Sequence, residues 1–277
     1  MTPLSPTGSD SASFQVSLSR DHPGLHDLEY RRRRDEIAAL ALAYEPGNTP
    51  PRVAYTAAEQ ATWRTIWEHL RPAHERFASV EVNAALDRWA PWEREIPQLD
   101  ELADESGPLD GTGFRFEPVP GLVPSSEFFS SLRRGVFQST QYMRHPSRPL
   151  YTPEPDLVHE LVGHAGTFAI PGVAALSRAF GEAAEGAGGS DLQRLERLYW
   201  FTVEFGLVAE GGSPKAFGAG LLSSAGELAG IQKADVRPFD VGVIEATAYG
   251  TSDLQTTLFV AGSLDELVEE TLAAVRR

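Results

Sequence analysis

Apolar residues recur every three or four positions along much of this 277-residue chain, which is the spacing of a helix with one buried face. This pattern predicts helices over residues 31–44, 57–69, 72–90, 157–167, 172–185, 191–210 and 264–276. Strand-like patterns are short and few, and the candidates for small strands or irregular segments are FRFEPV (114–119), PFDVGVIEATAY (238–249) and TTLFVAG (256–262). The chain is therefore expected to be mainly α with a small β component.

The first twenty residues differ from the rest of the chain. They are rich in Ser, Thr and Pro and poor in periodic apolar positions, so residues 1–20 are predicted to form a flexible tail. Residues 21–277 show no internal repeat and are enough for one hydrophobic core. We therefore expect a single domain over 21–277.

Composition narrows the classes of partner. A formal charge of −15 argues against nucleic acid, and the RRRR run at 31–34 is read as the solvated end of a helix. The absence of cysteine excludes disulfides and thiolate metal sites. The N-terminus has no basic start followed by an apolar stretch, and no apolar run approaches the roughly 20 residues that cross a bilayer. A cytoplasmic protein without a membrane partner is expected.

The candidate chemistry lies in HELVGH, residues 159–164. This segment differs from the HExxH motif of zinc proteases because its histidines are five positions apart and would diverge by roughly 140° on an ideal α-helix. Pro153 and Pro155 disfavour a helix before it, and Asp156 is a plausible N-cap. His159 is therefore predicted to lie at or before the start of the helix that carries His164.

A third candidate ligand lies forty residues further on. Glu204 falls within the predicted helix 191–210, which is mostly apolar and is expected to stop at Gly211 and Gly212. A carboxylate there is costly unless a cation or hydrogen bonds neutralise it. From the residues alone, a metal site made of His159, His164 and Glu204 and a structural role for each, such as a buried acid paired with an arginine, both remain open.

A series of segments resembles the pterin-dependent aromatic amino acid hydroxylases. Between His22 and Leu228 they occur in the family's order: HPGLHDLEYRRRR, PPRVAYT, IPQL, TGFRFEPVPGLVPSSEFF, VFQSTQYMRHPSRPLYTPEPDLVHELVGH, LYWFTVEFGL and KAFGAGLLSSAGEL. The resemblance implies a single hydroxylase-like catalytic domain of the small bacterial type, which we expect to be a monomer. It also implies Fe(II), a tetrahydropterin co-substrate and O₂, with a free aromatic amino acid as substrate.

The same resemblance implies roles for individual residues. His159, His164 and Glu204 match the iron ligands, with Asp156 and Ser223 expected to orient His159 and Glu160 to contact the pterin through water. The positions that match the pterin-binding segment are Gly121, Leu122, Val123, Ser125 and Phe128. Those that match the substrate pocket are Arg144, which would hold the carboxylate, and Thr152, Pro153, Trp200 and Phe205.

Several positions depart from the family pattern. Gln138 replaces a histidine and Gly135 an arginine of animal relatives, while Thr251, Asp253 and Leu254 differ from residues of phenylalanine hydroxylases near the substrate. L-Phenylalanine, converted to tyrosine, is the expected substrate. Phenylalanine 3-hydroxylation, tryptophan hydroxylation and, in another class, zinc-dependent hydrolysis remain alternatives.

Overall fold

The structure is a computed structural model that describes residues 18–104, 107–150, 152, 154–250 and 254–277. Most of the predicted tail, residues 1–17, lies outside the described residues. The α-helices are α1 (Leu28–Leu42), α2 (Ala57–Phe77), α3 (Val80–Leu86), α4 (Ser125–Arg133), α5 (Gly166–Phe168), α6 (Pro171–Ala183), α7 (Gly189–Tyr199), α8 (Ala219–Leu222), α9 (Ala225–Gly230), α10 (Val241–Ala246) and α11 (Leu264–Val275).

The remaining helical segments are not α-helical. The 3₁₀ turns are η1 (Asp87–Trp92), η2 (Leu99–Glu101) and η5 (Ile231–Lys233), and the π-helical segments are η3 (His159–Ala165) and η4 (Trp200–Glu204). The strands of the described part are β1 (Arg115–Pro118), β2 (Val136–Ser139), β3 (Leu207–Glu210), β4 (Ser213–Ala216), β5 (Asp235–Pro238) and β6 (Thr257–Ala261). The prediction of a mainly α fold with a small β component is confirmed.

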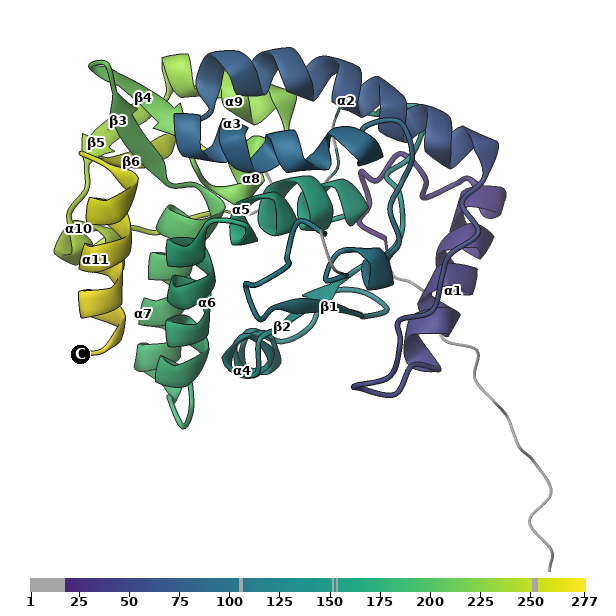
Figure 1. The fold of residues 1–277 in the computed structure, drawn as a ribbon, viewed down its shortest axis with the longest axis horizontal. Coiled ribbons are helices and arrows are strands. Elements are labelled where there is room, and N and C mark those ends of the chain that lie inside the picture. The colour runs from purple at the N-terminus through teal and green to yellow at the C-terminus, as the bar shows by residue number, and fades with distance from the viewer. Residues whose placement is uncertain (1–17, 105–106, 151, 153, 251–253) are drawn as a thin grey trace, which may run out of the picture.

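Helix α2 runs along one side of the molecule, and α6, α7 and α11 pack beside one another on another side (Figure 1). A capping box at Thr56 and Glu59 starts α2. The predicted break near residue 70 is wrong, because α2 continues through Pro72 to Phe77 and the chain breaks at Ser79, which caps α3. The buried face of α2, which includes Trp63 and Leu70, stabilises the helix across the proline.

The predicted helix 191–210 is also wrong in its second half. Helix α7 passes into the π-helical η4 at Trp200, and the chain then enters β3. Gly211 and Gly212 form the turn between β3 and β4, where both have positive φ angles of 57° and 78°. The two glycines therefore form the turn of a β-hairpin rather than the end of a helix.

The described strands form two small sheets. Strands β1 and β2 pair in parallel, and the other sheet has the order β4-β3-β6-β5. Two of the three predicted strand segments, 114–119 and 256–262, contain β1 and β6. Half of the third segment, 238–249, forms the helix α10, which Asp240 caps by accepting from the backbone N–H of Val243.

The main hydrophobic core surrounds the π-helical segment η3. Leu161 and Val162, inside that segment, are fully buried, and α8 packs directly against it. Among the described residues, no helix combines the length and apolar character needed to cross a bilayer. The two histidines of HELVGH thus lie on a segment that is packed into the main core.

Candidate functional site

Both segments that carry the candidate ligands are π-helical. In a π-helix the backbone hydrogen bond joins residues five apart, so side chains five positions apart come onto nearly the same face. His159 and His164 have this spacing and lie within η3, two residues after the helix begins at Leu157. The expectation that His159 lies at or before the helix start is therefore wrong, because the π-turn removes the angular divergence that an α-helix would impose.

Glu204 is the last residue of η4. The backbone N–H of Phe205 donates to the carbonyl oxygen of Trp200 at 2.9 Å, which closes a five-residue turn around the carboxylate. Glu204 thus lies at the end of the helical run rather than in its middle, as the sequence had suggested.

The three side chains converge. Nε2 of His164 lies 3.1 Å from Nε2 of His159 and 3.0 Å from Oε1 of Glu204, and Nε2 of His159 lies 3.5 Å from Oε2 of Glu204. One candidate ligand atom from each residue lies within 4.8 Å of the other two. The side chains are 15%, 2% and 13% exposed for His159, His164 and Glu204, so the cluster is largely buried and keeps limited solvent access at His159 and Glu204.

The protonation of these groups suits a metal cation. Burial lowers the pKa of His159 to about 4, against the opposing effect of Glu204, so this imidazole is neutral near pH 7. Burial acts to raise the pKa of Glu204, but its interactions with His164 and His159 outweigh burial and the pKa is lowered. The carboxylate faces two histidines instead of the arginine considered as an alternative. Two imidazole nitrogens and one carboxylate form the donor set of a 2-His-1-carboxylate iron site.

The two imidazoles are oriented by different means. Nδ1 of His159 lies 3.2 Å from Oγ of Ser223, and this hydroxyl donates to the carbonyl oxygen of Gly220 at 3.3 Å. The Nδ1 atom of His159 is therefore the donor, which leaves the Nε2 lone pair directed at the other ligands. His164 has no hydrogen bond at Nδ1 within the described part of the chain, and the ring of Phe137 packs against it at 4.6 Å.

Asp156 was expected to orient the ring of His159, but its carboxylate pairs with another side chain. Both oxygens of this buried carboxylate accept from the Arg144 side chain, from Nε at 2.8 Å and from Nη2 at 2.7 Å. Asp156 also accepts from the backbone N–H of His159 at 3.3 Å, which is the N-cap contact that the sequence predicted. Arg144 occupies the Asp156 carboxylate, and the side chain in contact with Nδ1 of the His159 imidazole is that of Ser223.

Arg144 is 3% exposed, and this fork-to-fork pair neutralises a guanidinium that would be costly to bury alone. Its Nη1 atom lies 3.5 Å from the carbonyl oxygen of Pro149, which is long for a hydrogen bond. Asp156 therefore connects Arg144, the candidate substrate-binding residue, to the first turn of the helix that carries His159.

Glu160 lies next to the first histidine and is also buried. Oγ1 of Thr140 donates to its carboxyl group at 3.2 Å. Burial, with the nearby charge of Glu204, raises the pKa of Glu160 well above its ordinary range.

The candidate pterin-binding residues lie on the surface beside this cluster. Gly121, Leu122 and Val123 precede α4, and the Leu122 side chain is 77% exposed. Ser125 is the first residue of α4 and donates to Glu196 of α7. The ring of Phe128 lies 5.5 Å from that of Phe137, which contacts His164, so one ring separates α4 from the ligand cluster.

The candidate substrate residues are partly brought together. The ring of Trp200 lies 4.7 Å from that of Phe205; Trp200 is the first residue of η4 and Phe205 directly follows its end. Oγ1 of Thr152 donates to the carbonyl oxygen of Glu154 at 2.8 Å, on the segment that leads to Asp156. Pro153 lies outside the described residues, as do Thr251 and Asp253.

Two glycines of the site were not singled out from the sequence. A Cβ atom at Gly163 would lie 2.7 Å from the carbonyl oxygen of Ala219, and one at Gly218 would lie 2.4 Å from the backbone carbonyl of Glu204. Helix α8 therefore approaches both π-helical segments more closely than any other residue type allows. The signal was present in GHAG and KAFGAG, but the contact partners are distant in the sequence.

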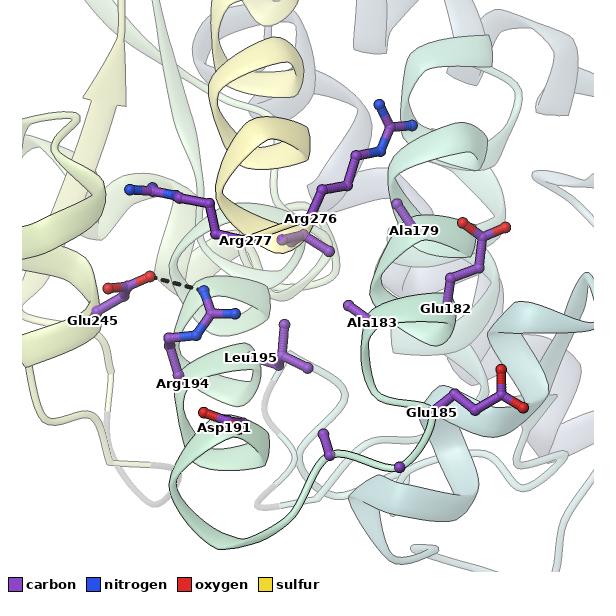
Figure 2. Close-up of a pocket in the computed structure, with 13 residues that line it drawn as sticks. Ala179, Glu182, Ala183, Glu185, Asp191, Arg194, Leu195, Glu245, Arg276 and Arg277 are labelled. Carbon is purple, nitrogen blue, oxygen red and sulfur yellow. Dashed lines mark hydrogen bonds and ion pairs between the residues drawn. The ribbon is translucent and has the colours of Figure 1, made fainter.

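A hollow of about 700 Å³ lies elsewhere in the molecule, between α6, α7, α10 and α11 (Figure 2). Its walls carry acids such as Glu182 and Glu185 and the arginines Arg194, Arg276 and Arg277. Arg194 lies ten residues before Glu204, roughly 15 Å along the helix axis. Among the candidate site residues that the structure describes, none lines this hollow.

Comparison with known proteins agrees with this geometry. Residues 6–275 match the model of the biopterin-dependent aromatic amino acid hydroxylases, and the chain belongs to this family. It is 40% identical to protein henna of Drosophila melanogaster and to phenylalanine-4-hydroxylase of Rattus norvegicus, over 94% and 93% of the chain, and 40% identical to tyrosine 3-monooxygenase of Homo sapiens over 91%. The chain spans only 58%, 58% and 49% of these relatives' own lengths.

Solved structures of the family are also similar. Phenylalanine hydroxylase of Chromobacterium violaceum, determined with bound iron(III) and 7,8-dihydrobiopterin, aligns with 80% of the chain and 82% of its own at 31% identity and a TM-score of 0.73. The phenylalanine hydroxylase of Colwellia psychrerythraea aligns with 84% of the chain and 93% of its own at 26% identity and a TM-score of 0.74.

Proposed function

We propose that this chain is a non-haem Fe(II), tetrahydropterin-dependent monooxygenase that hydroxylates the ring of a free aromatic amino acid, with L-phenylalanine converted to tyrosine as the favoured reaction. The observation that carries the proposal is the convergence of His159, His164 and Glu204 in a largely buried cluster, in a chain of the biopterin-dependent family. Such a donor set leaves coordination positions vacant for other molecules.

The donor set fits iron(II) by its chemistry. His159 and His164 would each give an Nε2 lone pair, and the Glu204 carboxylate would supply negative charge in a place where the described residues put no arginine or lysine beside it. Ser223 keeps the proton of His159 at Nδ1. When bound, the iron and the tetrahydropterin supply the electrons that activate dioxygen.

The remaining residues would bind and orient the organic molecules. Phe128, on α4, offers an aromatic face to a pterin ring, and the backbone of Gly121 to Val123 offers hydrogen-bonding groups at the surface. Glu160 would take part in the water-mediated contact that the family resemblance implies for it.

Arg144 would hold the carboxylate of the amino acid. Its Nε and Nη2 atoms are fixed by Asp156, so the guanidinium is already oriented and its weakly engaged Nη1 is the donor best suited to a second carboxylate. Trp200 and Phe205 would form the apolar wall for the aromatic ring. Thr152 and Pro153 are kept as substrate-pocket residues on the family resemblance alone.

The choice of L-phenylalanine rests on the two solved bacterial structures, both of phenylalanine hydroxylases. The curated relatives favour it less, because a tyrosine 3-monooxygenase and a phenylalanine-4-hydroxylase are equally identical to the chain. Tyrosine, tryptophan and the meta position of phenylalanine therefore belong in the test.

The test supplies purified protein with Fe(II), tetrahydropterin and oxygen and offers phenylalanine, tyrosine and tryptophan separately. Product mass and ring position are then measured. We expect para-hydroxylated phenylalanine, with oxidised pterin formed in equal amount. Metal-loaded protein that hydroxylates none of the three amino acids would contradict the proposal, and hydrolytic activity of the zinc-loaded form would favour the hydrolase instead.

A further inference from the structure

Gln255 makes a set of contacts that the candidate site does not explain. Its side-chain Oε1 accepts from the indole Nε1 of Trp200 at 3.0 Å, and its Nε2 donates to the carbonyl oxygen of Gly250 at 2.8 Å. Its backbone N–H is shared between the two carboxylate oxygens of Glu227, each at 3.2 Å. Three separate segments therefore meet at one glutamine.

Trp200 is held on its faces as well as at its edge. The ring of Phe205 lies 4.7 Å from one part of the indole, and that of Tyr249 stacks on it at 4.5 Å with an interplanar angle of 21°. Stacked rings can slide past one another at little cost, whereas a hydrogen bond fixes the in-plane position of the indole. The amide of Gln255 is the group that provides this fixed point.

The position of Trp200 also affects the ligand side of the site. Trp200 begins the π-helical segment that ends at Glu204, and its carbonyl oxygen accepts the hydrogen bond from Phe205 that closes the turn. The indole is thus the outer end of the same rigid unit that carries the carboxylate. A shift of the indole would change the aromatic wall before it changes the metal ligands, because side-chain contacts fix the indole whereas a separate backbone hydrogen bond closes the turn.

We infer that Gln255 is a specificity-determining positioning residue, which sets the place of the Trp200 indole and thereby the width of the aromatic wall that an amino acid side chain meets. This inference rests on the proposed function. Gln255 acts through Trp200, and Glu227 supports it by fixing the backbone from which the amide extends.

The test is a double-mutant cycle with Gln255→Met and Trp200→Phe. Methionine has a similar length but cannot replace the amide acceptor, and phenylalanine lacks the indole N–H. The measured quantity is the ratio of kcat/KM for phenylalanine to that for tryptophan, with the ratio of their dissociation constants from calorimetry. We expect Gln255→Met to change the ratio about tenfold in the wild-type background and less than about twofold beside Trp200→Phe, with KM for the pterin and bound iron unchanged.

Two controls separate this role from general destabilisation. Gln60 also uses its side chain in one backbone contact, accepting from Ile96 at 3.0 Å, but it lies on α2. Gln60→Met should leave the selectivity ratio unchanged. Hydrogen exchange at the Trp200 indole, followed by NMR and assigned through Trp200→Phe, should be slow in the wild type and faster in Gln255→Met.

Two results would overturn the inference. One is faster indole exchange in Gln255→Met with selectivity changed less than about twofold, which would make the contact purely structural. The other is an equal change in selectivity with and without the Trp200 indole. A wild type that binds the amino acids but hydroxylates none would contradict the proposed function alone, since the ratio of dissociation constants needs no turnover.

Discussion

The buried ligand cluster and the surface hollow of Figure 2 both contain several charged side chains, but they place them in opposite environments. In the cluster, three ionisable side chains lie within contact of one another, and packed helices hold their backbones. In the hollow, acids and arginines line about 700 Å³ of accessible space, and a surface ion pair joins Arg194 to Glu245 at 3.0 Å. The hollow offers accessible volume, whereas the cluster offers converging donor atoms, and converging donors are what a metal site requires.

The difference shows what makes charges chemically useful. Exposed pairs are screened by water and contribute roughly 0–1 kcal/mol, so their positions are only weakly fixed. Charges brought together in the core need a partner, and a cation meets that need for His159, His164 and Glu204. The following substitutions test this contrast.

The largest effect is expected from His164→Ala. Removing one of three ligands should abolish metal binding and turnover, while the fold persists because the surrounding core is otherwise unchanged. Metal content and activity measure the first effect and circular dichroism the second. His69→Ala, on the exposed face of α2, is the matched control and should keep both metal and activity. Retained activity in His164→Ala would exclude this residue as a ligand.

Gly218→Ala should have the next largest effect. The added methyl group would lie 2.4 Å from the backbone of Glu204, so α8 and η4 must separate. We expect a loss of about 1–3 kcal/mol in the free energy of unfolding, with weaker metal affinity. Gly230→Ala is the control, because a Cβ atom there has open space around it, and it should be neutral or slightly stabilising. Equal effects of the two substitutions would argue against close packing as the device that places Glu204.

Glu227→Gln tests a buried acid at the outer edge of the site. Burial raises the pKa of Glu227 to about 7 from an ordinary value of 4.5. The folded state therefore holds this proton more tightly than the unfolded chain, and the resulting stability is complete below pH 4.5 and lost as the pH rises through 7.

The variant lacks this titration. Relative to the wild type it should gain on the order of 1–2 kcal/mol of unfolding free energy between pH 4.5 and pH 8, a figure reduced because the carboxylate is partly exposed. Urea unfolding at the two pH values provides the measurement. A difference between the two proteins that does not change with pH would mean that Glu227 is not held protonated by burial.

The smallest effect is expected in the hollow. Arg194→Ala removes the ion pair with Glu245 and a contact of 3.2 Å with the carbonyl oxygen of Ala274. Stability should fall by no more than about 1 kcal/mol, and KM for the amino acid and for the pterin should not change. A tenfold change in either KM would connect the hollow to the active site.

The sequence predicted most helices because their apolar spacing is regular. It could not predict the π-turns, since one additional residue per turn leaves the apolar composition unchanged and alters only the backbone hydrogen bonds. The apolar spacing also continues through LVAE, so this segment was predicted to extend the helix that carries Glu204, although it forms β3. HELVGH and YWFTVEFG supplied the candidate side chains, and the family resemblance implied that they meet, but neither gave the geometry by which they do so.

Contacts between segments that are distant along the chain could also not be predicted from the sequence. The pairing of Arg144 with Asp156, the approach of Gly218 to Glu204 and the contact of Gln255 with Trp200 depend on the packing of separate elements. Propensity and spacing describe one segment at a time. The residues that position the site are therefore harder to predict than those that form it.

The π-turn of η3 links the spacing of the two histidines to the backbone hydrogen bonds of the helix that carries them. Such a turn is equivalent to an α-helix with one residue inserted, and its hydrogen bonds are less favourable than those of the regular ladder. Deleting Val162 would restore a regular helix and leave the histidines four apart, the spacing of a zinc protease motif. The extra residue therefore carries a local cost in backbone hydrogen bonding, and in return it brings this pair of imidazoles and Glu204 onto a common centre.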